Sequence, residues 1–388
     1  MASAAAVALA LTVAGCTHQA MLLGEPVPKG CAAKAAIGSE RCMGWYIDRL
    51  KMLEHDEYDD PELARYVSSV GERLVRASGD HRAWTFRVID DGDPQAGANL
   101  SPIVYIARGA LARMRDEAEL AGMLGHEIGH ILAGHARDLV IERNRGLRDS
   151  TWDLRSQRDD ELQADELAVL LTQRAGYDPH AVESMLRALA AGEPPDDPDH
   201  GSDPHPRWTE RLARIQAFAM HFRGGERRAQ EYLAHIENLV VDVDPRNWYA
   251  TDGTIVFARV GVALHLPDGW LSTFATSDDV GVNYTNGLAL HLSVMPARGK
   301  PTIKPNVAAA SYFETVEGNG RLLVINVEGF GGDLFAKQLR AAVRPARPDE
   351  VAMIRPRRID LSKPRTLWPD PLPADEEYRL FEVTSPRQ

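Results

Sequence analysis

Apolar residues recur at helical spacing in the first half of the chain. Five of them follow one another at intervals of four, three, four and one residues, namely Leu63, Val67, Val70, Leu74 and Val75. This spacing gathers them in one stripe and predicts an amphipathic helix that packs on a core. Residues 85–90 and 103–107 have strand patterns, and the Asp, Gly and Pro residues at 91–94 mark a turn between them.

Beyond about residue 240 the helical periodicity gives way to short alternating segments. They predict a helix at 334–343 and strands at 254–257, 262–266, 288–294 and 322–327. We therefore expect an α+β fold with a mainly helical domain and small sheet over residues 46–238, then a small α/β accessory module over residues 239–345. Residues 346–388 are rich in Pro and Arg and predict an extended, partly ordered tail.

Composition narrows the classes of function. The 388 residues are 44% hydrophobic, which is enough for a buried core. The net charge of −12, without clustered Lys and Arg, argues against nucleic-acid binding. The sequence of the accessory module holds no group of Cys, His and carboxylate residues at ligand spacing. By elimination, we expect this module to dock on a partner or to present the substrate.

The start of the chain has the pattern of an exported protein. Residues 2–15 are apolar, too short to span a bilayer, and predict a signal peptide. Residues 13–16, Val-Ala-Gly-Cys, resemble a bacterial lipobox. That resemblance implies a lipid on Cys16, a linker over residues 16–45 and membrane attachment, with Thr17 favouring the outer membrane. The alternatives are a plain signal peptide followed by a chance cysteine and a disordered N-terminus.

The two remaining cysteines, Cys31 and Cys42, are close in sequence. In an exported protein such a pair predicts a local disulfide, although two free thiols would fit the same sequence. No other apolar stretch reaches the length of a membrane-spanning helix. We therefore expect a chain that is attached to a membrane without crossing it.

Residues 126–130 read His-Glu-Ile-Gly-His inside an uninterrupted helical pattern. Positions i and i+4 lie on one helical face, so His126 and His130 present two imidazoles to one point, as tetrahedral zinc requires. Glu127 lies about 100° further round the helix and can act as general base on a water molecule at the open coordination position.

A catalytic zinc needs a third protein ligand. Glu161 and Asp165 also share one helical face at i and i+4. Glu161 can complete a His, His, Glu set, and Asp165 can accept the ring N–H of a ligating histidine. The alternative for this pair is an ordinary solvated acidic helix face.

At these residues the chain resembles peptidase family 48, the HtpX-like and CAAX-prenyl-protease-like zinc metallopeptidases, whose signature is H-E-x-x-H followed by E-x-x-A-D. The resemblance covers about residues 50–220 and includes further stretches at 60–67, 116–120, 175–179, 202–206 and 210–212. It implies a gluzincin fold with one zinc ion per chain. It also implies an extended substrate that pairs with the edge of the sheet above the metal.

The chain departs from its relatives at two places. Residues 95–102 replace a stretch that is commonly N-A-F-A-L-P-G-G-like, which puts the substrate edge in doubt. Thirty residues separate His130 from Glu161, fewer than expected for the family, and the charged stretch 137–160 predicts a solvated helix and loop.

Three further residues are candidates near the site. His205, in a Pro-His-Pro context after an acidic loop, matches a family histidine close to the metal. The resemblance implies that it stabilises the oxyanion or occupies the fourth zinc position, whereas sequence alone favours a solvated loop. Arg211 is a weaker oxyanion candidate. His135 lies five residues after His130, which predicts a structural role.

These residues favour a zinc-dependent endopeptidase of the bacterial envelope, a periplasmic lipoprotein that hydrolyses unfolded or misassembled envelope proteins. Two alternatives stay open. The altered stretch at 95–102 would suit an assembly chaperone with a latent or structural zinc site. A zinc hydrolase acting on non-peptide substrates would use the same ligands.

Overall fold

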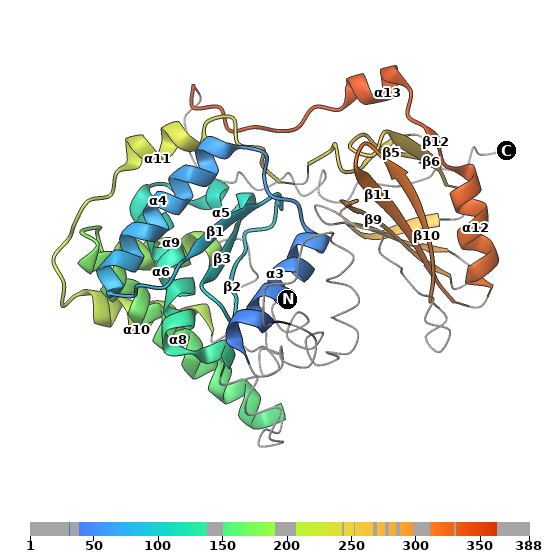
Figure 1. The fold of residues 1–388 in the computed structure, drawn as a ribbon. Helices are drawn as coiled ribbons and strands as arrows, with labels where there is room; N and C mark the ends of the chain where they lie inside the picture. Colours follow the sequence, from blue (N-terminus) through green and yellow to red (C-terminus); the bar gives the residue numbers. More distant parts are fainter. Residues whose placement is uncertain are drawn as a thin grey trace.

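The computed structural model has the predicted α+β class (Figure 1). It describes residues 31, 39–137, 150–190, 207–242, 244–251, 253–266, 270–275, 279–284, 288–297, 311–329 and 331–362. The first part contains, in chain order, α3 (Glu40–Glu54), α4 (Pro61–Ser78), β1 (Thr85–Ile89), β2 (Ala96–Ala98), β3 (Ile103–Ala107), α5 (Arg108–Arg113), α6 (Glu117–Ala133), α8 (Ser150–Arg174), α9 (Ala181–Ala190), α10 (Trp208–Ala219) and α11 (Ala229–Ile236).

Helix α4 is the amphipathic helix that the sequence predicts. It begins at Asp60, whose carboxylate accepts hydrogen bonds from the backbone N–H groups of Glu62 and Leu63, and it ends at Gly79, whose φ is 79°. All five apolar residues of the predicted stripe are buried. Each such side chain contributes about 1.5–3 kcal/mol when fully buried. The stripe therefore fixes one face of the core.

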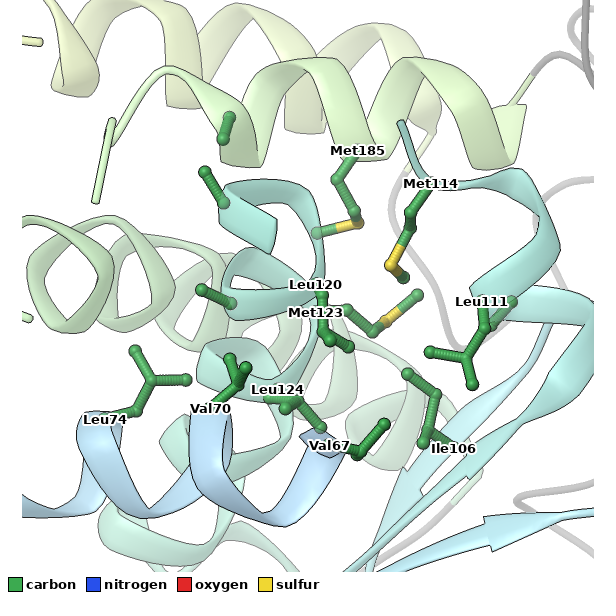
Figure 2. Close-up of a cluster of buried hydrophobic side chains, with 14 of the residues drawn as sticks. Val67, Val70, Leu74, Ile106, Leu111, Met114, Leu120, Met123, Leu124 and Met185 are labelled. Atoms are coloured by element: carbon green, nitrogen blue, oxygen red, sulfur yellow. The ribbon is translucent and has the colours of Figure 1, made fainter. Parts of the chain in front are cut away.

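The core lies between α4, the sheet and the helix that carries the His-Glu-Ile-Gly-His sequence. Figure 2 shows Val67, Val70 and Leu74 of α4 facing Leu120, Met123 and Leu124 of α6. Ile106 of β3 closes this layer from the sheet side. Helix α6 is almost wholly buried. Its position is therefore set by packing along most of its length.

The small sheet has the order β1-β3-β2, with β1 parallel and β2 antiparallel to β3. Strands β1 and β3 coincide with two predicted segments. Strand β2 was not predicted, because Ala96-Gly97-Ala98 lacks the β-branched and aromatic residues that mark strands in a sequence. It forms the edge of the sheet beside α6.

Helix α3 carries the predicted disulfide. Cys31 is bonded to Cys42, and the Tyr46 hydroxyl donates to the Cys31 carbonyl at 3.0 Å, so residue 31 is held against this helix. The predicted signal segment and Cys16 lie outside the described residues, as does His205. Among the helices that the structure describes, none combines the length and apolar character needed to cross a membrane.

The accessory module consists of two antiparallel sheets and a covering helix. One sheet has the order β10-β11-β9-β8-β7 and the other has the order β12-β6-β5-β4. The elements are β4 (Tyr249–Thr251), β5 (Thr254–Phe257), β6 (Val262–His265), β7 (Trp270–Ala275), β8 (Asp279–Tyr284), β9 (Ala289–Pro296), β10 (Ser311–Gly318), β11 (Arg321–Glu328), α12 (Gly332–Ala342), β12 (Arg344–Pro345) and α13 (Pro348–Met353). Every predicted strand and the predicted helix of this region have counterparts among them.

Part of the segment that composition assigned to an extended tail is packed. After α13, Ile354 is buried beside Val256 and Ala263 of the module, whereas Ile359 is buried in the core of the first domain. The backbone N–H of Ile359 donates to the carbonyl of Leu239 at 2.9 Å. The segment therefore crosses back from the module to the first domain, as Figure 1 shows. The burial of Ile354 at one end of this segment and of Ile359 at the other cannot be predicted from composition.

Buried charges join the two parts of the molecule. Arg108, fully buried in the first domain, donates to Asp90 at 2.7 Å and to the Val240 carbonyl at 2.9 Å. Asp90 also pairs with Arg259 of the module at 2.5 Å, and Arg259 reaches Asp244 at 2.6 Å. Breaking one member of such a buried network leaves its partner without compensation. The network thus stabilises one arrangement of the domain and the module.

Replacing Asp244 tests the strength of this junction. Burial alone would raise the pKa of Asp244, but hydrogen bonds from Arg246 and the charge of Arg259 outweigh it and lower the pKa from 3.8 to about 2. This shift corresponds to about 2 kcal/mol of stability at pH 7. We expect Asp244→Asn to lower the free energy of unfolding at pH 7 by at least that amount, measured by urea unfolding.

The effect should depend on pH with a defined sign. Because the pKa is lower in the folded state, the contribution is complete above about pH 4 and is lost as pH falls towards 2. The gap between wild type and Asp244→Asn should therefore narrow in acid. Asp242→Asn is a control, because the ion pair between Asp242 and Arg357 is partly exposed and should contribute under about 1 kcal/mol. Equal losses in both variants would contradict a special role for Asp244.

Candidate metal centre

Two helices bring the predicted ligands together. His126 and His130 lie on α6, and Glu161 lies near the middle of α8. The helices approach closely at glycines of α6: a Cβ on Gly125 would lie 3.3 Å from Ala168 Cα, and one on Gly129 would lie 3.1 Å from Leu167 Cβ. Larger residues there would separate the helices. Sequence reasoning missed these glycines, although their spacing on one face of an apolar helix is a signal of close packing.

The three ligand groups have the separations that a tetrahedral zinc site needs. His126 Nε2 lies 3.1 Å from His130 Nε2, and each of these atoms lies 3.4 Å from a carboxylate oxygen of Glu161. Ligands at 2.0–2.1 Å from a tetrahedral ion are about 3.3–3.4 Å apart. Two imidazole nitrogens and a carboxylate are also the donor set of catalytic zinc sites. The residues of this chain therefore fit the ion.

Glu127 follows the first ligand on the same helix and is 8% exposed. Burial alone would lower the pKa of Arg211, but Asp165, Glu161 and, to a smaller extent, Glu127 outweigh it and raise that pKa. Glu127 is thus part of the same charged cluster. The charges of three carboxylates act on one guanidinium in this cluster, and this excess of negative charge favours a divalent cation.

Asp165 supports the first ligand in the way predicted from its position. Its Oδ1 lies 2.9 Å from His126 Nδ1, the ring nitrogen opposite the ligand atom. Arg211 of α10 holds the same carboxylate from the other side, at 2.8 Å and 2.7 Å from its two oxygens. Burial alone would lower the pKa of His126, but Asp165 and Glu161 outweigh it and raise the pKa to about 10. The carboxylates thus favour positive charge at this position.

Arg211, the weaker oxyanion candidate in the sequence, contacts the carboxylates of the site and holds Asp165 in place. It is 6% exposed, binds Asp165 through two nitrogens and lies 3.7 Å from Glu161. A bidentate contact of this kind fixes the orientation of a carboxylate. Arg211 therefore positions Asp165 and, through it, the ring of His126.

The second ligand has a different partner from the first. His130 Nδ1 lies 2.9 Å from His135 Nδ1, and His135 Nε2 lies 2.9 Å from Gln163 Oε1 on α8. Burial and the neighbouring His126 lower the pKa of His130 to about 3, so its ring is neutral at pH 7. A neutral imidazole carries one proton and can use its other nitrogen as a metal ligand. His135 was predicted to be structural, and it is in direct contact with a candidate ligand.

The edge strand β2 lies beside α6, the helix that carries two of the candidate ligands. Ala107 N–H donates to the Gln95 carbonyl and Asn99 N–H donates to the Ile103 carbonyl, each across the pair with β3. Antiparallel pairing alternates, so the N–H and C=O groups of Ala96 and Ala98 point away from β3. The altered stretch at 95–102 therefore still forms the edge strand that an extended peptide could extend.

Comparison with known proteins agrees with this geometry. The family model described as "Peptidase family M48" matches residues 61–147 and 149–219. The chain is 26% identical over 257 residues to the Beta-barrel assembly-enhancing protease of Escherichia coli (strain K12), covering 56% of this chain and 52% of that protein. It is 27% identical over 149 residues to the Mitochondrial metalloendopeptidase OMA1 of Schizosaccharomyces pombe, covering 33% of this chain and 44% of that protein.

The extent of these matches is limited. The chain spans about half the length of the curated relatives it matches. The residues that the family model matches include His126, His130, Glu161 and Arg211, and they end before the accessory module begins.

Proposed function

Because residues 61–147 and 149–219 match the model of peptidase family M48, we propose that this protein is a zinc-dependent endopeptidase of the bacterial cell envelope. Its substrates are unfolded or misassembled envelope proteins. The observation that carries the proposal is the placement of His126, His130 and Glu161 at tetrahedral spacing beside the buried Glu127. The relatives' names, a beta-barrel assembly-enhancing protease and a metalloendopeptidase, support the same chemistry.

The reaction assigns a separate task to each side chain. Bound zinc would supply Lewis acidity, which makes a water molecule acidic enough to lose a proton near pH 7. Glu127 accepts that proton and delivers it to the amine that leaves when the peptide bond breaks. Asp165, held by Arg211, lies against His126 Nδ1, which would leave Nε2 available as the ligand atom. His205 is proposed as a further polar group near the oxyanion.

The substrate class follows from the edge strand. Ala96 and Ala98 offer backbone groups, and a Cβ built on Gly97 between them meets no atom within 4 Å. Recognition through the backbone selects an extended chain with little regard to its side chains. A folded protein buries most such backbone in its own helices and sheets. We therefore expect unfolded polypeptides to be cleaved and compact ones to be spared.

The cellular location is proposed from the start of the chain. The apolar run at 2–15 with Cys16 suits an exported lipoprotein attached to the outer membrane. The Cys31–Cys42 disulfide supports an oxidising compartment such as the periplasm. A protease placed there would meet membrane proteins that have not yet assembled.

Metal removal and substrate folding test the proposal together. The purified protein should cleave reduced, alkylated casein and should leave a folded, disulfide-intact protein such as lysozyme uncut. A chelator should abolish cleavage, and zinc added in slight excess should restore it. Gel electrophoresis with mass spectrometry of the products would show internal cuts. Cleavage that persists after complete metal removal would refute the proposed mechanism.

A further inference from the structure

The contact between His130 and His135 has no role in the reaction proposed above. Helix α6 ends at Ala133, and Gly134 caps it with φ 79°. In a continuous helix a residue five positions on would point about 140° away from His130. The left-handed turn at Gly134 redirects the chain instead, and His135 Nδ1 comes to lie 2.9 Å from His130 Nδ1. His135 is 9% exposed.

The proton positions along this contact follow from the ligand geometry. His130 Nε2 faces His126 and Glu161, so in a neutral ring that serves as a ligand the proton lies on Nδ1. His135 Nδ1 must then accept. Its own proton lies on Nε2, which faces two acceptors, Gln163 Oε1 at 2.9 Å and Asp160 Oδ1 at 3.6 Å. Every group in this series has a compatible partner.

We propose that His135 is a positioning residue that fixes the tautomer and ring orientation of His130 for metal binding. Gln163, two residues from Glu161 on α8, anchors His135 in turn. The two ligand histidines are thus supported by different means, His126 by the carboxylate of Asp165 and His130 by the imidazole of His135. This role depends on the proposed zinc site, because a ligand tautomer matters only if the ion binds there.

Two substitutions at residue 135 separate positioning from packing. Phe retains the size of the ring but offers no acceptor, whereas Asn is smaller but places an oxygen near the position of Nδ1. Loss of an outer partner of a metal ligand typically weakens metal binding by about 10–100-fold. We expect a loss of this size for His135→Phe and affinity within a few-fold of wild type for His135→Asn. A packing role would give the reverse order.

The measurement is zinc affinity by competition with a chromophoric chelator, with the visible spectrum of the cobalt-substituted protein as a second readout. Circular dichroism would establish that each variant is folded. Gln163→Leu provides a variant at an exposed position, for which we expect a smaller loss in the same direction. His235→Phe is the matched control, because this exposed histidine stacks on Tyr66 and should leave zinc affinity unchanged.

The outcomes are distinct. Weaker zinc binding by His135→Phe than by His135→Asn, with an altered cobalt spectrum, supports the positioning role. Wild-type affinity in His135→Phe, or weaker binding by Asn than by Phe, overturns it while the zinc site stands. A wild-type protein that binds no zinc overturns the proposed function and this role together.

Discussion

Glu127→Gln should abolish peptide cleavage while zinc remains bound. The amide keeps the shape of the carboxylate but cannot accept the proton that the attacking water must lose. General-base catalysis contributes about 10²–10⁴-fold to a rate, so we expect kcat on reduced, alkylated casein to fall by at least that factor. Zinc content should stay at one ion per chain, because Glu127 is not among the three candidate ligands. Product release and bound zinc would be measured on the same samples.

Glu166→Gln is the control for that substitution. Glu166 lies on α8, pairs with partly exposed Arg214 at 2.8 Å and is not among the candidate ligands. The same chemical change there should leave cleavage near the wild-type rate. Undiminished cleavage by Glu127→Gln would contradict the proposal that the protein is a peptidase with Glu127 as its general base.

Glu127→Gln also separates the peptidase from the assembly chaperone. A chaperone with a structural zinc site would need the fold and the ion but not the base. In a strain lacking the protein, the peptidase hypothesis predicts rescue by wild type and failure by Glu127→Gln. Equal rescue by both would favour the chaperone. The formed edge strand β2 fits either function, since both bind an extended chain.

The ligands could be predicted because each pair is local in sequence. His126 with His130, and Glu161 with Asp165, are spaced at i and i+4 on continuous helices, so helical geometry alone places each pair on one face. The convergence of the two helices could not be derived in the same way. It depends on the small residues at Gly125, Gly129 and Ala168, whose partners are distant in sequence.

The contact of His135 shows why spacing arguments fail at helix ends. Counting five residues from His130 assumes that α6 continues, but Gly134 ends it and reverses the direction of the next side chain. Glycine at this place is itself a known stop signal. The contact of His135 was therefore missed because the helix was assumed to continue, although Gly134 is a signal that it ends.

Long-range polar contacts had no local signal at all. Asp90 is the last residue of one predicted strand and Arg108 follows another, yet nothing in either segment indicates that Arg259 of the accessory module completes the group. The same holds for Arg211, whose partner Asp165 lies 46 residues earlier. Periodicity predicts which face of an element is buried, but it does not predict which charges meet there.

Glu161→Ala should remove zinc binding, because it deletes one of three protein ligands. We expect affinity to fall by more than about 100-fold, the upper range for losing only an outer partner of a ligand. The fold should survive, since Arg211 keeps its two hydrogen bonds to Asp165. Chelator competition would measure the affinity, and cleavage should be lost with the ion. Glu166→Ala, five residues further along α8, should bind zinc as wild type does.

Zinc-dependent stability gives a second measure that does not involve catalysis. A ligand at 1,000 times its Kd stabilises the folded state by about 4 kcal/mol, and one that binds 100-fold more weakly stabilises it by about 1.4 kcal/mol at the same concentration. Urea unfolding with and without zinc should therefore show a large gain for wild type and at most a third of it for Glu161→Ala. An equal gain in both proteins would place the ion elsewhere, because only a ligand carboxylate couples this side chain to zinc so strongly.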